Sequence, residues 1–395
     1  MHMEGRKALF VFLSLPLLLL ADCCGTGPAE PPAEKPTVQP AEQAPEPFTV
    51  EVKEISKHGN AMLAVTFEEM KAHGLEVGDT ITVTVGDNTF DMPVGTGYTD
   101  VDTGGMLCRF DTEDGVVSLA VNMGSFAAET GMGVKETMEE EPGYTWTLTV
   151  PRVTLALKEK KGYLDEYNVR NLTRTNARED YPGLTEEEFA NFRAVSATGI
   201  GEGILYRSST PVEPALGRNE YAMAATEAAG IKTVLNLDDS VETMESYPAY
   251  PGSYYSRCAL INPEMNYDFG SEEFSRKVKD CLLFMTENEA PYLIHCKEGK
   301  DRTGILCALL ECFMGASYEE VAADYMLTYR NYYGVTREDA VYGVILKNNL
   351  EKTLCGIFEI GSLEGADLSA QAAAYFRSLG LTDGQLESLR AVLRS

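Results

Sequence analysis

Basic residues are scarce in this chain of 395 residues. It carries 33 Lys and Arg against 61 Asp and Glu, which gives a net charge of −28 at pH 7. A chain this acidic repels nucleic acid and anionic lipid surfaces. We therefore expect no nucleic-acid partner, and any pocket that binds an anion must gather its positive charge locally.

Residues that usually hold metal ions are few as well. The chain has four histidines, none of which pairs with another at metal spacing, and its nine cysteines contain no Cys-x-x-Cys pair. This composition predicts no metal site and implies no cofactor. We expect Cys296 to remain a free thiol, and we expect Cys307 and Cys312 to pack inside a helix.

The apolar run near the start of the chain is too short for a comfortable membrane span. Residues 8–20 follow a short basic segment and match a secretory signal. Leu20-Ala21-Asp22-Cys23 then resembles a bacterial lipobox. We expect residues 1–24 to be a signal peptide with lipid attachment at Cys23 or Cys24; the alternative is ordinary signal-peptidase cleavage. Either outcome places the protein outside the cytoplasm, anchored to the membrane or secreted.

Composition divides the remainder of the chain. Residues 25–47 are rich in Pro, Ala and Glu and predict a disordered, extended tether. The length that follows is enough for two folded domains. We place a small β domain at residues 48–155 and a catalytic domain at residues 156–395.

Short alternating segments dominate residues 48–155. Thr80–Val85 and Tyr144–Val150 alternate in polarity, and Gly and Asp turns separate such segments, which predicts a small all-β barrel or sandwich. Residues 55–63, 98–101 and 119–124 resemble the C-terminal β domain of the S-adenosylmethionine hydroxide adenosyltransferases. The catalytic domain of that family has no counterpart here, so the resemblance implies the fold and not the adenosyl chemistry. The ligand or partner of this domain stays open.

The most informative segment is His295-Cys296-Lys297-Glu298-Gly299-Lys300-Asp301-Arg302-Thr303-Gly304. An apolar run precedes it and a strong helical pattern follows it, which predicts a strand, a tight loop and a helix. Such a loop turns backbone N–H groups inward, where they can hold phosphate oxygens beside the positive end of the helix dipole. Arg302 adds a planar fork for the same oxygens. These positive groups favour the thiolate of Cys296, which makes it a nucleophile.

This segment resembles the signature HCxxGxxR[ST] of the cysteine-dependent protein tyrosine phosphatases, and the resemblance extends over residues 165 to 395. It implies an α/β domain with a central, mostly parallel sheet flanked by helices and a P-loop between strand and helix. By the family's mechanism, Cys296 forms a phosphocysteine and Arg302 binds the phosphoryl oxygens. Thr303 hydrogen-bonds the sulfur, and His295 braces the loop. The substrate-binding positions are Lys297, Glu298, Gly299 and Lys300.

The loop's GKDRTG form resembles bacterial atypical tyrosine and lipid phosphatases, and its aspartate resembles that of the myotubularin-type lipid phosphatases. The chain has one Trp and no Trp-Pro-Asp sequence, which many tyrosine phosphatases use to carry the general acid. Asp301 is therefore our first candidate for protonating the leaving oxygen. The alternatives are that Asp301 only accepts loop N–H groups, or that Asp268 is the acid.

Other segments fit the same family. Residues 230–237 predict a short buried strand. The family tends to carry Asp-Leu-Arg at the end of this strand, whereas this chain reads Asn236-Leu237-Asp238. Arg207 either orients a loop by pairing with an acid or forms a plain surface salt bridge. Residues 317–320 predict a capping box that opens a helix, and the tail after residue 379 predicts a turn and a short helix.

These observations predict a phosphatase that acts on phosphotyrosine, with dual specificity open, through a phosphocysteine intermediate. Lys297 and Lys300 either favour a substrate with more than one phosphate, such as a phosphoinositide, or only balance local charge. A phosphoinositide or inositol-phosphate phosphatase is the alternative enzyme. A module that binds phosphate without turnover is the alternative outside enzymes, and the intact set of Cys296, Arg302 and Thr303 argues against it.

Overall fold

A computed structural model describes residues 45–137 and 144–394. The expected signal peptide (1–24) and most of the expected tether (25–47) lie outside the described residues. Within the described ranges, no helix combines the length and the apolar character needed to cross a membrane.

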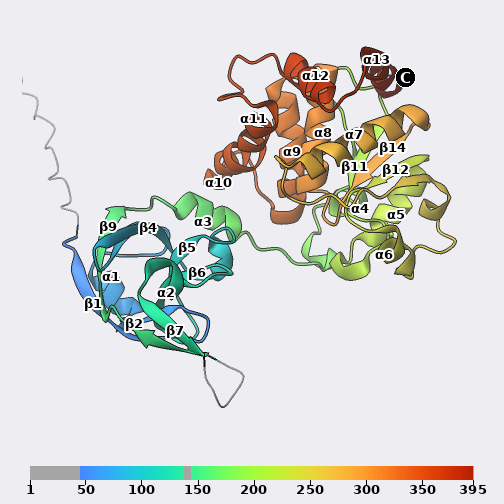
Figure 1. The fold of residues 1–395 in the computed structure, drawn as a ribbon. Coiled ribbons are helices and arrows are strands. Elements are labelled where there is room, and N and C mark those ends of the chain that lie inside the picture. Colours follow the sequence, from blue (N-terminus) through green and yellow to red (C-terminus); the bar gives the residue numbers. More distant parts are fainter. Residues whose placement is uncertain (1–44, 138–143, 395) are drawn as a thin grey trace, which may run out of the picture. The chain divides into compact units, whose positions relative to one another are not determined.

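Seven strands close a barrel in the order β1-β2-β6-β5-β4-β3-β9, which confirms the predicted all-β barrel (Figure 1). These strands are β1 (Phe48–Ile55), β2 (Ala61–Thr66), β3 (Thr80–Val85), β4 (Asn88–Gly95), β5 (Met106–Phe110), β6 (Val116–Val121) and β9 (Arg152–Glu159). A separate hairpin and three short helices complete this part of the chain: β7 (Gly133–Thr137), β8 (Tyr144–Leu148), α1 (Phe67–Ala72), α2 (Phe126–Thr130) and α3 (Leu164–Arg170).

Alternation along the strands builds the barrel core. In β3 the side chains of Ile81, Val83 and Val85 are buried while the threonines between them are partly exposed. Successive residues of a strand point to opposite faces, so this pattern turns every second side chain into the barrel. Leu119 of β6 is fully buried in the same cluster.

A second sheet has the order β10-β11-β14-β12-β13. The pairs β11–β14, β14–β12 and β12–β13 are parallel and the pair β10–β11 is antiparallel, so the sheet is mostly parallel, as predicted. The strands are β10 (Arg193–Ala194), β11 (Leu205–Ser208), β12 (Thr233–Asn236), β13 (Ala259–Ile261) and β14 (Tyr292–His295).

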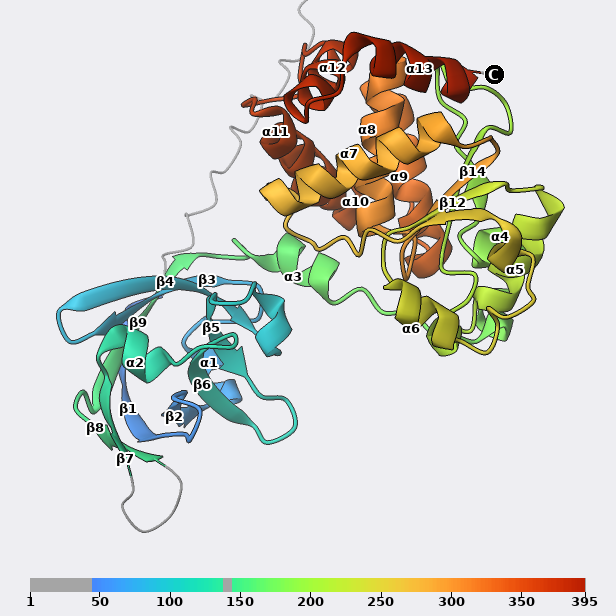
Figure 2. The same cartoon turned by 45° about the vertical axis from the view of Figure 1, so that its right-hand side comes forward.

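Helices cover both faces of this sheet (Figures 1 and 2). Leu235 and Ile294 pack into one core cluster, and their neighbours Val234 and Leu293 pack into another on the opposite face. Strands buried on both faces read as short continuous apolar runs, which is why β12 and β14 stand out in the sequence. The helices are α4 (Glu186–Phe189), α5 (Asn219–Ala228), α6 (Val241–Ser246), α7 (Glu272–Glu287), α8 (Asp301–Met314), α9 (Tyr318–Tyr333), α10 (Ala340–Ile345), α11 (Lys352–Phe358), α12 (Leu368–Ser378) and α13 (Asp383–Arg394).

Two helices begin where the sequence predicts. The capping box at Ser317 and Glu320 opens α9, and α13 follows the turn near residue 380. Cys307 and Cys312 are buried in α8, as expected.

The register of the parallel strands brings three chain segments to one edge. His295, the last residue of β14, lies opposite Ser208 of β11 and Asn236 of β12. Leu237 continues the pairing by donating its N–H to the carbonyl of His295 at 2.8 Å. The residues that follow β11, β12 and β14 therefore meet at the carboxyl edge of the sheet, where ligands of such sheets bind.

The barrel core generates the first prediction. Replacing Leu119 by Ala removes buried methyl groups and should lower the free energy of unfolding of the barrel by about 2–5 kcal/mol. The sole tryptophan, Trp146, lies on β8, so its fluorescence during denaturation reports on this part of the chain. Met123→Ala is the matched control because this side chain is 87% exposed. Equal midpoints for the two variants would contradict the assigned core.

Candidate active site

The segment from Cys296 to Lys300 forms a short loop between β14 and α8. Cys296 follows the last residue of β14 and is only 3% exposed, and α8 begins at Asp301. The loop therefore lies at the sheet edge described above, and the positive end of the α8 dipole faces it.

Four consecutive carbonyl groups of this loop accept hydrogen bonds from residues outside the loop. The backbone N–H of Thr210 donates to the carbonyl of Lys297 at 3.1 Å. The amide of Asn191 donates to the carbonyls of Glu298 (3.1 Å) and Gly299 (3.3 Å). The guanidinium of Arg207 donates to the carbonyls of Gly299 (2.9 Å) and Lys300 (3.4 Å).

This bracing fixes the direction of the loop's N–H groups. In a planar trans peptide the C=O and the N–H point in opposite directions. With the carbonyls of residues 297–300 turned toward Thr210, Asn191 and Arg207, the N–H groups of residues 298–301 turn to the other side. A row of convergent N–H groups at a helix N-terminus can bind an anion.

Arg207 belongs to a buried ion cluster. It is fully buried and contacts Asp324 at 2.5 Å, and Asp324 also accepts from Arg193 at 2.8 Å. Burial alone would raise the pKa of Asp324, but the two guanidinium groups lower it to about 2. The interpretation of Arg207 as a surface salt bridge is therefore wrong; it orients the loop, which was the other reading of the sequence.

Arg302, in the first turn of α8, is 5% exposed and reaches two neighbouring loops. Its Nη1 donates to the carbonyls of Met265 (3.1 Å) and Leu237 (3.5 Å). Its Nη2 donates to the hydroxyl of Tyr267 at 3.0 Å and forms an ion pair with Asp238 at 2.8 Å. Its Nε is buried and has no hydrogen-bond partner among the described residues. Burial lowers the pKa of Arg302, but its electrostatic interactions, with Cys296 and Asp238 first, outweigh burial and hold the pKa above its usual value, so the group stays cationic.

The other charged side chains of the loop are each paired. Lys297 binds Glu213 at 2.7 Å, and Glu298 forms an ion pair with Arg174. Lys300 binds both oxygens of Asp301, at 2.8 and 2.9 Å. Burial lowers the pKa of Lys300, but Asp301 outweighs this effect and raises it well above its usual value.

His295 and Thr303 flank the loop without exposed atoms. The Nε2 of His295 lies 2.7 Å from the hydroxyl of Tyr255, and its Nδ1 lies 3.3 Å from the carbonyl of Cys296. Burial lowers the pKa of His295 to about 4, so the ring is neutral at pH 7. The hydroxyl of Thr303 has no hydrogen-bond partner among the described residues, so the expected bond to the sulfur is not made in this structure.

Comparison with known proteins assigns the family. The family model described as "Tyrosine phosphatase family" matches residues 184–395, more than half of the chain. The chain belongs to the tyrosine phosphatase family. It is thus a phosphoric monoester hydrolase, and the family resemblance seen in the sequence is confirmed.

The barrel has its own match. The model of the SAM hydroxide adenosyltransferase C-terminal domain matches residues 50–139 of this phosphatase, in agreement with the sequence resemblance. No curated protein matches the chain.

Solved structures similar to this phosphatase share only part of it. A conserved protein from Thermotoga maritima is 24% identical, covering 28% of this chain and 36% of that one, with a TM-score of 0.23. A second, from Thermus thermophilus, is covered over 35% of its length. The catalytic core of the PP-IP phosphatase SIW14 from S. cerevisiae is 21% identical (40% of this chain, 85% of that one, TM-score 0.26). P. aeruginosa TpbA in complex with pTyr is 15% identical (49% and 93%, TM-score 0.28).

The structure brings together most of the residues singled out in the sequence, and it adds others. His295, Cys296, the loop residues 297–300, Asp301, Arg302 and Thr303 all lie at the edge of the sheet. Asp268 is exposed, and among the described residues its carboxylate forms no hydrogen bond or ion pair with this loop. Asn191, Asp324 and Asp238 were missed as site residues. The altered Asn236-Leu237-Asp238 triplet was the one available signal.

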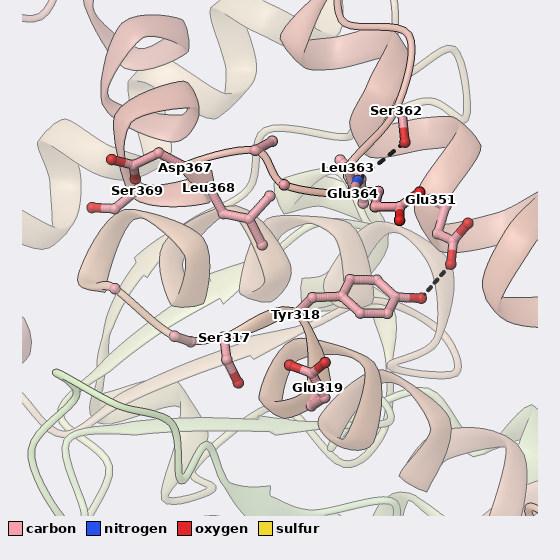
Figure 3. Close-up of a pocket in the computed structure, with 14 residues that line it drawn as sticks. Ser317, Tyr318, Glu319, Glu351, Ser362, Leu363, Glu364, Asp367, Leu368 and Ser369 are labelled. Carbon is pink, nitrogen blue, oxygen red and sulfur yellow. Dashed lines mark hydrogen bonds between the residues drawn. The ribbon is translucent and has the colours of Figure 1, made fainter.

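A separate hollow of about 700 Å³ lies near the other end of α8 (Figure 3). Carboxylates of Glu319, Glu351, Glu364 and Asp367 line it, and Tyr318 donates to Glu351 at 2.5 Å. Because α8 rises about 1.5 Å per residue, this hollow lies on the order of 20 Å from the loop. Its negative charge repels phosphate, so it does not compete with the loop as the phosphatase site.

The tight backbone around Gly299 generates the second prediction. Gly299 has a φ of +68°, and an added Cβ would overlap the carbonyl oxygen of Ser208. Gly299→Ala should therefore displace the loop and break its hydrogen bonds to Thr210, Asn191 and Arg207. The affinity for inorganic phosphate, measured by competitive inhibition, should fall by at least about tenfold. Gly252→Ala is the control, because its φ is +74° but no atom lies within 4 Å. Equal affinity in the two variants would refute the tight fit.

The buried imidazole generates a pH prediction. The unfolded chain protonates His295 below about pH 6.5, whereas the folded protein does so only near pH 4. The unfolded state then binds more protons, so the free energy of unfolding should fall by up to about 3 kcal/mol as the pH drops from 6.5 to 4. Denaturation of wild type and His295→Gln across this range tests it. If the free energy of unfolding of His295→Gln fell between pH 6.5 and 4 as steeply as that of wild type, His295 would not be the buried titrating group.

Proposed function

We propose that this phosphatase hydrolyses phosphotyrosine esters through a phosphocysteine on Cys296. The observation that supports the proposal is the loop that Cys296 begins between β14 and α8. Hydrogen bonds to its carbonyl groups turn the N–H groups of the same peptides away from the donors, as binding of an anion would require. Two further donors lack a partner in the described residues, the Nε of Arg302 and the hydroxyl of Thr303. Both residues come shortly after Cys296 in the sequence. A phosphoryl oxygen would accept a hydrogen bond from Nε of Arg302, and the thiolate of Cys296 would accept one from the hydroxyl of Thr303.

The geometry supports a two-step displacement. The three phosphoryl oxygens bind the loop N–H groups and the side-on fork of Arg302, formed by Nε and Nη2. The thiolate of Cys296 attacks phosphorus, the ester oxygen departs, and water then cleaves the S–P bond. Thr303 hydrogen-bonds the departing sulfur. His295 is neutral and buried, so it holds the backbone of Cys296 and does not act as a base.

Two features favour a phenolic monoester over a polyphosphorylated substrate. Tyr267 is 61% exposed, and its ring lies 4.6 Å from the guanidinium carbon of Arg302, so it offers an aromatic wall beside the bound phosphate. Lys297 and Lys300 are each paired with a carboxylate. Their charge is therefore balanced locally and adds little attraction for a second phosphate. A phosphoinositide or inositol-phosphate substrate is the alternative, since Lys297 keeps 44% of its side chain exposed.

The proposed cellular location of this phosphatase rests on the sequence alone. The hydrophobic run at residues 8–20 and the motif around Cys23 support a phosphatase that works outside the cytoplasm on a lipid anchor. The acidic composition supports a membrane contact through this anchor and not through the folded surface.

The nucleophile assignment gives a direct test. Cys296→Ser should abolish turnover while retaining substrate binding, because the loop N–H groups and Arg302 stay in place. Phosphate release by the full chain would be measured on a phosphotyrosine peptide, a phosphoserine peptide and a set of phosphoinositides.

Cys355→Ser is the control, since this partly exposed cysteine lies on α11. If the wild-type chain released phosphate fastest from phosphoinositides, these would replace phosphotyrosine as the proposed substrate. Release at the wild-type rate by Cys296→Ser would refute the mechanism, and no release by wild type would favour a phosphate-binding module.

A further inference from the structure

Asp238 occupies a place at the site that the family pattern does not predict. It follows β12 and lies one residue beyond Leu237, whose N–H pairs with the carbonyl of His295. The parallel register thus brings Asp238 to the same level as the start of the catalytic loop. Its side chain is 20% exposed, so the carboxyl group is not sealed inside the protein.

The carboxylate shares a guanidinium nitrogen with the expected phosphoryl group. Asp238 Oδ1 lies 2.8 Å from Nη2 of Arg302, and this nitrogen together with the unpartnered Nε forms the side-on fork. A phosphoryl oxygen in that fork and the carboxylate of Asp238 would be neighbours. Two anions on one nitrogen repel each other, and a shared proton removes the repulsion.

We propose that Asp238 is the proton donor to the leaving oxygen. This inference rests on the proposed phosphatase mechanism and deepens it. Asp238 hydrogen-bonds the ester oxygen and gives it a proton as it departs, and the contact of Asp238 with the fork of Arg302 holds its carboxyl group next to the phosphoryl group.

The two aspartates singled out in the sequence are less suited to this task. Both oxygens of Asp301 bind the ammonium of Lys300, so neither oxygen of this carboxylate is free to face a leaving group. Asp268 is exposed, and its backbone N–H is held by the side chain of Asn266. Of the three, only Asp238 forms an ion pair with the arginine of the site within the described residues.

The proton balance is complete over the two steps. In the first, the thiolate of Cys296 forms the S–P bond, the P–O bond breaks toward the leaving oxygen, and Asp238 gives its proton to that oxygen. In the second, the carboxylate of Asp238 takes a proton from water as the water oxygen attacks phosphorus. The S–P bond breaks toward sulfur, which restores the thiolate, the acid form of Asp238 and free phosphate.

Leaving-group sensitivity tests the assignment. Phenolate needs a proton to depart, whereas p-nitrophenolate is stable without one. Asp238→Asn in the full chain should lower kcat for phenyl phosphate by about 10²–10⁴-fold and for p-nitrophenyl phosphate by at least about tenfold less. Asparagine keeps an acceptor oxygen for Arg302, so a purely orienting role would leave both rates near wild type. Asp301→Asn and Asp268→Asn are the matched controls, and each should affect the two substrates equally.

The outcomes separate this inference from the mechanism on which it rests. Equal losses on both esters in Asp238→Asn, or the selective loss in Asp301→Asn or Asp268→Asn instead, would overturn the role of Asp238. If Cys296→Ser still abolished both activities, the phosphatase mechanism would stand. A wild-type chain inert toward both esters would overturn the two together.

Discussion

The site depends on one constraint, the capture of four consecutive loop carbonyls by donors behind the loop. Thr210, Asn191 and Arg207 supply these donors, and the planarity of the peptide then turns the N–H groups of the same peptides away from the donors. Arg207 can do this while fully buried because it forms an ion pair with Asp324. The direction of these N–H groups is therefore fixed by contacts within the protein, and under the proposed function substrate binding does not have to order them.

Charge is arranged on two scales. The whole chain carries −28, yet Arg174, Lys297, Lys300 and Arg302 all lie at or beside the loop. Each of them has a carboxylate partner, so the positive field is short in range and falls away outside the pocket. An anionic group is attracted only when it reaches the N–H groups and the fork of Arg302. The shape and chemistry of the residues around the loop then contribute more to substrate selection than long-range electrostatic attraction does.

Much of this was predictable from sequence, for identifiable reasons. The candidate catalytic segment is local: the strand, Cys296, Gly299, Arg302 and the start of the helix follow one another within about a dozen residues. The barrel was predictable because its strands alternate in polarity. The role of Arg207 was one of two open interpretations, but its acid partner Asp324 and the contact of Asn191 with the loop were not predictable, because these segments are distant in sequence and meet only through the parallel register and the packing of α9. Asp238 appeared in the sequence as a departure from the family triplet, and its contact with Arg302 needed the register of β12 against β14. The charges of Lys300 and Asp301 could be read from the sequence, but the contact of both Asp301 oxygens with the ammonium of Lys300 needed the structure.

The burial of α8 has a consequence for how the substrate preference of this chain could diversify. Every residue of this helix except Asp301 is buried, so the loop precedes a tightly packed helix in which most substitutions would disturb the core. The segments that contact Arg302 from outside, around Leu237–Asp238 and Met265–Tyr267, do not belong to this helix. A new substrate preference could arise by exchanging residues in these two segments, while Cys296 and its loop stay anchored to the buried helix.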